Sequence, residues 1–265
     1  MTYKHLIYVF TTILVLSFLM RISTTSVTTA QNVTDLQLKI SSDQKSYILG
    51  QLIKLDFLLK GADGEPFKLR TIPTVENGYL RVWISRSPED FSEYIGPQWG
   101  LGEGNKLPQV LPAFRSSATI LYNNKPPRFS SVPENRIQTE FAMPRAGIYF
   151  IKASAVIWNE KVTSDDDNVI IESDPIEVVI DEPLGNDKKI WNMIKDDGDL
   201  AYFMQQGDLR RQGYEERREK INKILNGASA GNGDSVLLNQ LQSSMEKLRI
   251  SETKIMQTRQ HRQKH

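Results

Sequence analysis

Hydrophobic and polar positions alternate in short runs from Leu36 to Asp181. The period of two is clearest at residues 36–40, 53–59 and 80–84. Such alternation indicates β-strands with one buried face, because successive side chains of a strand point to opposite sides. Further strands are expected at residues 118–122, 137–143, 147–158, 168–173 and 175–181. About seven or eight short strands separated by Gly, Pro and Asp turns predict an all-β antiparallel sandwich.

A helical period replaces the alternation after Asp181. Asn186 or Asp187 is the expected N-cap of a first helix, because both side chains accept hydrogen bonds from free amides. Three more helices are expected, at DLAYFMQQG, at YEERREKINKILNG and over residues 235–262. The linker at 227–234 is flexible by composition. The sequence therefore predicts a small α-helical C-terminal region.

The last expected helix has an apolar seam that contains one charged residue. Glu252 occupies a position where an apolar residue is due. About two and a half imperfect heptads are too few for a stable coiled coil. We expect this helix to pack back on its neighbours or to fray as a charged tail, and oligomerisation through it is the alternative.

The first thirty residues have the composition of an export signal. Lys4 precedes an apolar run from Leu6 to Met20, and a polar stretch with Thr28 and Ala30 follows. This order is typical of a secretory signal peptide cut near Ala30, and the run is shorter than the roughly 20 residues that span a bilayer. We expect a secreted or periplasmic protein of a bacterial envelope, with retention as an N-terminal anchor as the alternative. The expected organisation is a signal peptide (1–30), the sandwich (31–183) and a helical extension (184–265).

Composition narrows the available chemistry. The 265 residues include no cysteine, which excludes disulfides, thiolate nucleophiles, zinc–thiolate sites and iron–sulfur clusters. Residues 31–242 carry 25 basic and 30 acidic residues, a poor balance for binding nucleic acid. Residues 243–265 carry six Lys or Arg against two Glu, so the basic excess belongs to the C-terminal tail.

Two stretches carry markers of a fold. SDQKSYILGQLIKLDFLLKGADGEPFKL resembles the opening of macroglobulin-type and other immunoglobulin-like domains of bacterial surface proteins, with Asp43, Tyr47 and Gly50 at the matching positions. FAMPRAGIYFIKASAV resembles the last strands of the same class. The resemblance covers residues 36–182 and implies an immunoglobulin-like or fibronectin-III-like scaffold. It departs from the family at Leu49, where Pro is frequent, and the chain lacks the thioester cysteine.

The stretch MPRAGIYFIKA allows two interpretations, an exposed reactive loop or a corner of the fold. Pro144 keeps the preceding residue extended, and Gly147 permits a tight bend. Tyr149 then starts a strand, with the spacing of a tyrosine corner whose hydroxyl bonds the backbone a few residues upstream. We expect the corner, with Tyr149 and Ile151 on one face.

Residues for acid–base or nucleophilic catalysis are scarce. Histidine occurs only at positions 5, 261 and 265, so the expected sandwich has no imidazole base and a Ser-His-Asp triad is excluded. His261 and His265 have the spacing of a helical metal pair but lack the Glu that follows the first His in metalloproteases. GLGEG lacks the context of a phosphate-binding loop and is interpreted as a turn. We expect no enzymatic activity and no cofactor.

Three consecutive aspartates in TSDDDN, Asp165, Asp166 and Asp167, are weak candidates for binding calcium. Calcium loops use alternate positions, and adjacent side chains in a turn diverge. A solvated hairpin tip is therefore the favoured interpretation, and no metal is expected.

Residues 87–135 form the longest expected connection and combine aromatic residues with prolines. Long ordered loops on a rigid scaffold often carry binding sites, and aromatic residues dominate interface energetics. Phe91, Tyr94 and Trp99 are therefore the candidate binding residues. The alternative is that these aromatics fold inward and close the open end of the sandwich.

Three functions remain open. The first is an exported non-catalytic interaction or structural module whose helical extension docks or recruits another envelope protein. The second is a carbohydrate-binding or enzyme-accessory domain, with Tyr94 and Trp99 stacking on a sugar. The third is a protease inhibitor in which Lys125 or Arg128 mimics a substrate. We expect the first, with no nucleic acid or nucleotide as partner.

Overall fold

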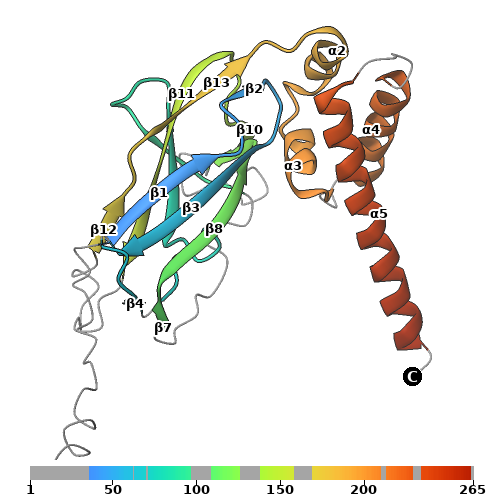
Figure 1. The fold of residues 1–265 in the computed structure, drawn as a ribbon. Coiled ribbons are helices and arrows are strands. Elements are labelled where there is room, and N and C mark those ends of the chain that lie inside the picture. The colour runs from blue at the N-terminus through green and yellow to red at the C-terminus, as the bar shows by residue number, and fades with distance from the viewer. Residues whose placement is uncertain are drawn as a thin grey trace, which may run out of the picture.

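The structure is a computed structural model that describes residues 36–61, 63–69, 71–96, 109–125, 138–157, 169–209, 213–228 and 234–263. Within these residues, mostly antiparallel β-sheets are followed by four C-terminal helices (Figure 1). The predicted order of a β-rich part and a helical part is thus confirmed. The predicted signal peptide lies outside the described residues. None of the helices in these ranges is both long and apolar enough to cross a membrane.

The first sheet has three antiparallel strands in the order β1-β3-β8. They are β1 (Leu36–Ser42), β3 (Ile53–Gly61) and β8 (Ala113–Ile120). Leu38 of β1 is paired with Leu59 of β3, and both side chains are buried. Lys39, which follows Leu38, and Asp56, which lies between the buried Leu55 and Phe57, are exposed on the other face. The predicted alternation of residues 36–40 and 53–59 is therefore confirmed.

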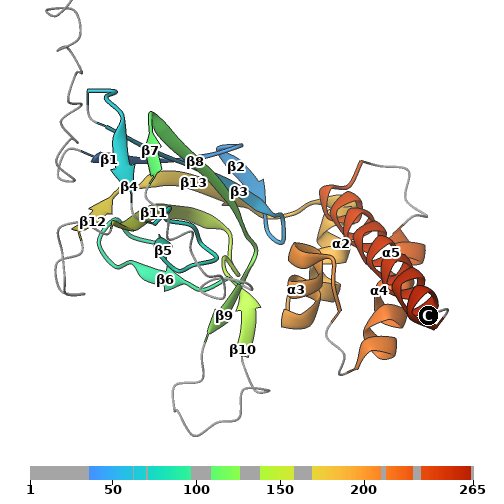
Figure 2. The ribbon, with the colours of Figure 1, turned by 90° about the horizontal axis from the view of Figure 1, so that it is seen from below.

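The second sheet has six strands and includes four of the predicted ones. Its order is β2-β13-β11-β5-β6, and β12 also pairs with β11. The strands are β2 (Ser46–Ile48), β5 (Leu80–Ser85), β6 (Ser92–Tyr94), β11 (Gly147–Ile157), β12 (Val169–Glu172) and β13 (Ile176–Asp181). The pair β2–β13 is parallel and the other pairs are antiparallel. Because β1 contacts β11, β12 and β13, the two sheets pack against each other (Figure 2).

Four further strands form two short ladders. They are β4 (Phe67–Leu69) with β7 (Gln109–Leu111), and β9 (Tyr122–Lys125) with β10 (Gln138–Phe141). The expectation of one long connection at residues 87–135 is wrong, because this segment contains β6 to β9. The strand predicted at 118–122 also has different bounds, since β8 ends at Ile120 and β9 begins at Tyr122. Strands of three residues were missed because they are too short to show an alternation.

The helices are α2 (Gly185–Ile194), α3 (Gly198–Gln206), α4 (Tyr214–Ala228) and α5 (Val236–Gln263). The expected capping of α2 by Asn186 or Asp187 is wrong, because Leu184 is at its N-cap and makes no side-chain cap bond. The carboxylate of Asp187 instead accepts hydrogen bonds from Ser235 Oγ (2.6 Å) and the Leu237 amide (2.8 Å) at the start of α5. Helix N-termini have free amides and a positive dipole end, so Asp187 ties α2 to α5.

The helices share one hydrophobic core with the strands. Trp191 of α2 and Phe141 of β10 pack edge to face, with ring centroids 4.9 Å apart. Tyr202 of α3 meets Tyr122 of β9 in the same way at 5.6 Å. Aromatic pairs of this geometry contribute beyond the area they bury. We therefore expect the β-rich part and the helices to unfold together.

Candidate functional site

The corner predicted at Tyr149 is confirmed. The Tyr149 hydroxyl donates a hydrogen bond to the backbone carbonyl of Arg145 (2.8 Å). Between these residues Gly147 has a φ of 141°, a conformation that favours glycine. Tyr149 and Ile151 are buried on one face of β11, whereas Pro144 and Arg145 are exposed. This hydrogen bond therefore stabilises the bend at residues 145–147 against the start of β11.

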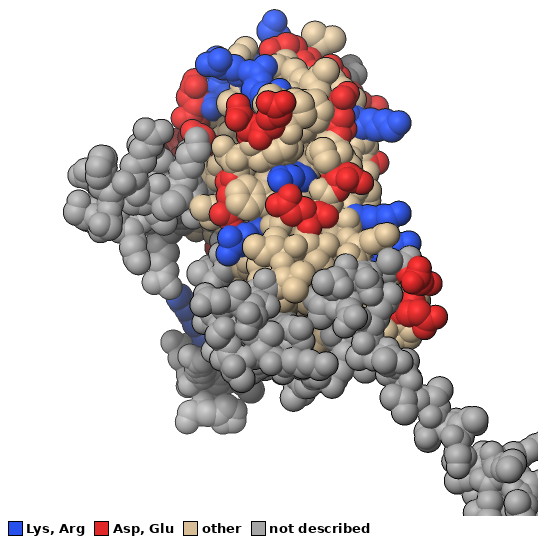
Figure 3. Space-filling model, turned by 90° about the vertical axis from the view of Figure 1, so that its left-hand side faces the viewer, with Lys and Arg blue, Asp and Glu red and all other residues tan. Residues whose placement is uncertain are grey.

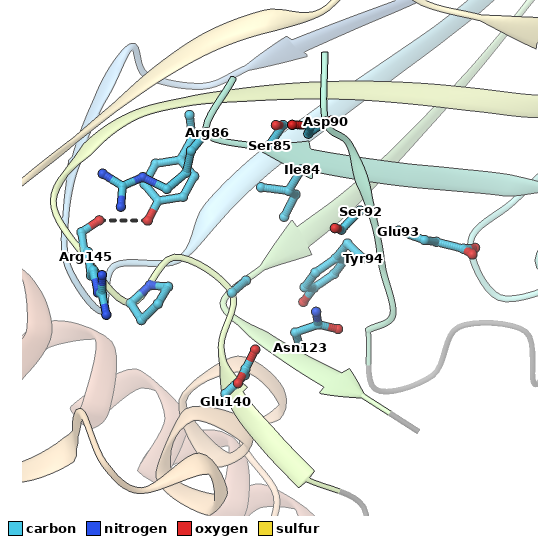
Figure 4. Close-up of a pocket in the computed structure, with 13 residues that line it drawn as sticks. Ile84, Ser85, Arg86, Asp90, Ser92, Glu93, Tyr94, Asn123, Glu140 and Arg145 are labelled. Carbon is cyan, nitrogen blue, oxygen red and sulfur yellow. Dashed lines mark hydrogen bonds between the residues drawn. The ribbon is translucent and has the colours of Figure 1, made fainter. Parts of the chain in front are cut away.

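A cavity of about 420 Å³ opens beside this corner (Figure 4). It is lined by the end of β5 and the turn after it, by β6, by the facing residues of β9 and β10, and by the corner itself. Its charged and amide side chains are Arg86, Asp90, Glu93, Asn123, Glu140 and Arg145. The volume is in the range of roughly 300–1,000 Å³ that small-ligand sites occupy. None of the lining residues is His or Cys.

Two guanidinium groups belong to the corner side of the cavity. The guanidinium carbon of Arg86 lies 5.6 Å from the centroid of the Tyr149 ring, a cation–π contact. A Cβ atom at Gly147 would lie 3.0 Å from Arg86 Nη2, so the missing side chain leaves Arg86 room to approach. Within the described part of the chain, neither Arg86 nor Arg145 forms an ion pair. Both cations are therefore available to an anion.

Carboxylates and one amide line the rest of the cavity. Glu93 and Glu140 come from β6 and β10, and Asp90 comes from the turn after β5. Asn123 Oδ1 accepts a hydrogen bond from the Ile95 amide (3.2 Å). Because a backbone N–H can only donate, this contact fixes the orientation of the Asn123 side chain and leaves its NH₂ group for another partner.

Of the three predicted binding residues, the structure describes Phe91 and Tyr94, and Trp99 lies outside the described residues. Tyr94 is 1% exposed, and burial raises the pKa of its hydroxyl. Phe91 is half-buried, with Lys152 Nζ 5.0 Å from its ring centroid. A buried ring offers no face to a sugar. Tyr94 thus folds inward, as the alternative interpretation held.

Gln205, which no pattern in the sequence singled out, joins α3 to the strands at a buried point. Its Oε1 accepts a hydrogen bond from the Tyr122 amide (3.2 Å), and its Nε2 donates one to the Thr119 carbonyl (2.7 Å). The Tyr94 hydroxyl lies 3.3 Å from both side-chain polar atoms. No local signal separates Gln205 from its neighbour Gln206, because the partners come from strands that are remote in sequence.

Several other predicted residues lie outside the described ranges. They include Asp165, Asp166, Asp167, Arg128, His265 and the GLGEG stretch, while Lys125 ends β9 and His261 is in α5. Across the ranges that are described, no group of three or more Asp, Glu, His or Cys residues is arranged to hold a metal ion. The face shown in Figure 3 carries acidic and basic side chains intermixed.

The C-terminal part of α5 projects past the other helices (Figure 1). Glu252, the charged residue in the apolar seam, accepts a hydrogen bond from the Tyr214 hydroxyl and lies 3.1 Å from Arg218 Nη1, both in α4. The helix thus packs back on its neighbour as far as Glu252. Beyond it, Ile255 and Met256 are 50% and 57% exposed. We name residues 253–263 the α5 arm.

Comparisons with known proteins assign no family to the chain. No protein-family model matches it, and no curated protein matches it. Among solved structures, it is similar to a mutant beta-glucosidase from Listeria innocua in complex with laminaribiose (TM-score 0.26, 11% identity, 57% of this chain and 16% of that chain). It is also similar to Spo0M, a sporulation control protein from Bacillus subtilis (TM-score 0.25, 6% identity, 61% of this chain and 55% of that chain). The chain spans less than two thirds of either protein, and TM-scores this low assign neither a fold family nor a function.

Proposed function

We propose that this chain is an exported, non-catalytic interaction module of the cell envelope. Its β-rich part is an immunoglobulin-like sandwich that carries the helices, and its α5 arm binds an acidic segment of a partner protein. The observation that carries the proposal is the arm itself, an exposed stretch of helix whose packing partners within the described residues end at Glu252.

The apolar seam of α5 continues into the arm. Met245 and Leu248 are buried. Ile255 lies seven positions after Leu248 and Met256 lies eleven positions after Met245, so both share the helix face of the buried pair. The arm continues the 28-residue helix α5, so its backbone hydrogen bonds are already made, and what it lacks is burial of these apolar side chains. A partner that covered Ile255 and Met256 would supply the burial that α2, α3 and α4 supply to the first part of the seam.

The charge of the arm indicates the chemistry of the partner. The arm contains three Lys or Arg residues and no Asp or Glu, and Lys264 follows directly after it in the sequence. Two arms placed side by side would bring like charges together, which disfavours a second copy of this chain. An acidic segment would complement the arm, and complementary charge governs both specificity and association rate.

The rest of the molecule fixes the direction of the arm. Gln240 of α5 accepts a hydrogen bond from the Leu52 amide (2.9 Å) and donates one to the Gly50 carbonyl (3.2 Å). Together with the contacts of Gln205, these bonds hold the helices against the strands. Because the first part of α5 is held rigidly, less conformational entropy is lost when a partner binds the arm.

The two alternative functions have less support among the described residues. The carbohydrate-binding hypothesis requires Tyr94 to stack on a sugar, but the Tyr94 ring is buried. The inhibitor hypothesis uses Lys125, which is the last residue of β9, or Arg128, which lies outside the described ranges. Neither alternative accounts for the exposed apolar side chains of the arm.

The first test deletes residues 253–265. This deletion keeps Glu252 and its contacts with Tyr214 and Arg218, so we expect a melting temperature within about 2 °C of the full chain and the loss of partner binding. Deleting the whole helical region would be a poor test, because it would uncover Phe141 and Tyr122.

The second test places a photo-cross-linking amino acid at position 256, with the same group at Ile170 of β12, which is 63% exposed, as the control. We expect a protein of the envelope extract to cross-link at 256 but not at 170. The double variant Lys254→Glu/Arg259→Glu should abolish this product, whereas Lys188→Glu/Lys189→Glu, with the same charge change on α2, should retain it. Cross-linking only to a second copy, only to lipid, or to nothing would contradict the proposal.

A further inference from the structure

Strand β8 is an edge strand of the three-stranded sheet (Figure 1). Among the described strands it pairs only with β3. The Lys54 carbonyl of β3 accepts a hydrogen bond from the Asp43 amide, on the β1 side of the sheet. Because the backbone groups of one residue point to the same neighbour in an antiparallel ladder, Lys54 does not bond Thr119, its paired residue on β8. Thr119, Ser117 and Arg115 therefore direct their N–H and C=O groups away from the sheet.

Some of these outward groups have no partner. The Thr119 carbonyl accepts a hydrogen bond from Gln205 Nε2 (2.7 Å), in agreement with its outward direction. The N–H and C=O groups of Arg115 and Ser117 have no hydrogen-bond partner among the residues that the structure describes. An edge with unpaired groups is a template for another strand, and proteins protect such edges with lysines, prolines or bulges. The stretch from Arg115 to Thr119 contains no lysine or proline, and its pairing with β3 has no bulge. It is therefore open to an added strand.

A groove of about 500 Å³ lies beside this edge. It is bordered by the end of β8, by α3 and by the connection that precedes β5, through Ser117, Thr119, Gln205, Gln206, Val75 and Glu76. Its volume is within the range of roughly 300–1,000 Å³ that binding sites occupy. Successive side chains of an added strand would point alternately to the two faces of the sheet. The groove has residues on each side, because Asp56 lies on the exposed face and Val75 belongs to the core.

The ionisable residues of the groove indicate the chemistry of the added strand. They are three carboxylates and one ammonium group, those of Asp43, Asp56, Glu76 and Lys54. None of these four groups forms an ion pair within the part of the chain that is described. Asp43 accepts a hydrogen bond from the Tyr47 hydroxyl, whereas the carboxylates of Asp56 and Glu76 have no partner in these ranges. The uncompensated negative charge favours a basic side chain in the groove.

The position of this basic side chain follows from the register. Asp56 is paired with Ser117, and both side chains lie on the exposed face of the sheet. A lysine or arginine opposite Ser117 on the added strand can extend over this small side chain to the Asp56 carboxylate, and oppositely charged neighbours stabilise a sheet. Arg115, two residues away on the same face, is not part of the groove lining. The residue opposite Arg115 should therefore be neutral or acidic.

From these observations we infer that the edge of β8 binds an extended segment of a partner protein as an added strand, with a lysine or arginine of that segment opposite Ser117. Main-chain hydrogen bonds to Arg115 and Ser117 supply affinity, and the groove with Asp56 supplies specificity. This site does not include the α5 arm. Deletion of residues 253–265 should therefore leave binding at β8 intact, and the two proposals fail separately.

A second copy of this chain fits the edge less well than a free segment. Its β8 would place Arg115 opposite Ser117, but that strand continues directly into β7. The continuation would meet Gln205, which already occupies the Thr119 carbonyl. A segment that ends or turns beside α3 avoids this contact.

The probe is the heptapeptide Thr-Thr-Val-Lys-Val-Thr-Thr with an acetylated N-terminus and an amidated C-terminus, titrated into the full chain. Amide hydrogen exchange, followed by nuclear magnetic resonance, reports on the edge directly. In the free chain the amides of Ser116 and Ala118, which point to β3, should exchange slowly and those of Arg115 and Ser117 quickly. The peptide should slow exchange at Arg115 and Ser117 at least about tenfold, because both amides gain an acceptor.

Two sets of modified peptides distinguish strand addition from other modes of binding. Methylation of one backbone nitrogen removes a donor from only one edge of an extended peptide. Methylation at the lysine or at the following valine should weaken binding at least about tenfold, and the other methylation should have little effect. A loss at the lysine indicates antiparallel addition, and a loss at the valine indicates parallel addition. Replacement of the lysine by glutamate should weaken binding at least about fivefold in either case.

Protein variants test the role of Asp56. Asp56→Asn removes an exposed carboxylate and should weaken binding of the lysine peptide about threefold, with an unchanged melting temperature. Glu177→Gln, exposed on β13 of the other sheet, is the matched control and should bind the peptide as the unmodified chain does.

Four results would each overturn the inference. They are slow exchange at Arg115 and Ser117 without peptide, equal effects of the two methylations, equal binding of the lysine and glutamate peptides, and no protection at millimolar peptide. Protection that needs only a higher concentration of the chain itself would identify a second copy as the occupant and would overturn the inference as well.

Discussion

Replacing Gln205 by leucine should weaken the junction between the helices and the strands. The Gln205 side chain satisfies the Tyr122 amide and the Thr119 carbonyl and contacts the Tyr94 hydroxyl. Leucine has a similar volume but no polar atoms, so the Tyr122 amide and the Thr119 carbonyl would lose these hydrogen bonds without the opening of a large cavity. The variant therefore tests the polar contacts and not the packing.

The structure allows an estimate of the cost. A buried polar group that loses its partner costs about 1–3 kcal/mol. The bond to the Tyr122 amide is fully buried and belongs to the upper part of this range, whereas the bond to the Thr119 carbonyl is only partly buried. Burial of the leucine side chain returns about 1 kcal/mol. We expect the free energy of unfolding to fall by about 2–4 kcal/mol.

Urea unfolding, followed by far-ultraviolet circular dichroism and by tryptophan fluorescence, measures the effect. Gln206→Leu is the matched control: Gln206 is the next residue and is half-buried, and its replacement should change the free energy of unfolding by no more than about 0.5 kcal/mol. The two signals of the unmodified protein should report one transition, because helices and strands share a core.

Two results would refute this reasoning. A loss below about 1 kcal/mol, or equal losses for the two leucine variants, would show that the buried bonds of Gln205 do not stabilise the junction. Separate transitions for the two signals in the unmodified protein would show that the helices are an independent unit.

Two further predictions concern tyrosines. Tyr149→Phe should lower the free energy of unfolding by about 1–3 kcal/mol, because the Arg145 carbonyl loses its donor, and an unchanged urea midpoint would refute the role of the corner. Burial, aided by the bonds to Asp43 and Glu252, raises the pKa of Tyr47 and Tyr214 from 10.0 to about 12. The unfolded chain then loses these protons first, so these tyrosines' contribution to stability should be fully present below pH 10 and should fall as the pH rises from 10 to about 12. Urea midpoints across this range test the effect; Tyr214→Phe should reduce the slope, and an equal slope in that variant would contradict it.

The features that were predicted correctly depend on neighbours in the sequence. The alternation around Leu38 and Leu59 reports which side of a strand is buried, and this follows from the geometry of a single strand. The corner joins Arg145 and Tyr149, which are four positions apart, so Gly147 and the spacing were enough to predict it. The change of period after Asp181 similarly marked the start of the helices.

The predictions that were wrong concern residues whose partners are distant in the sequence. Asp187 has a good capping side chain and lies at the start of a helix, yet it caps α5 because packing brings that N-terminus within reach. In the sequence, Glu252 interrupts an apolar seam, and only the structure shows that Tyr214 and Arg218 of α4 lie opposite it and bind its carboxylate. Tyr94 was predicted to be a binding residue on an exposed loop, because its segment shows little alternation. It belongs to β6 instead, and its side chain is buried in the core.

Taken by itself, the sequence determined the strand-rich and helical parts, the Tyr149 corner, the absence of cysteine chemistry and the basic C-terminal tail. Only the tertiary structure decided that Gln205 joins the two parts, that the arm begins after Glu252, and that Arg86, Asn123 and Arg145 border one cavity. The physical reason is that periodicity and turn geometry are properties of short segments, whereas these contacts depend on which faces of remote elements are brought together by burial of the common core.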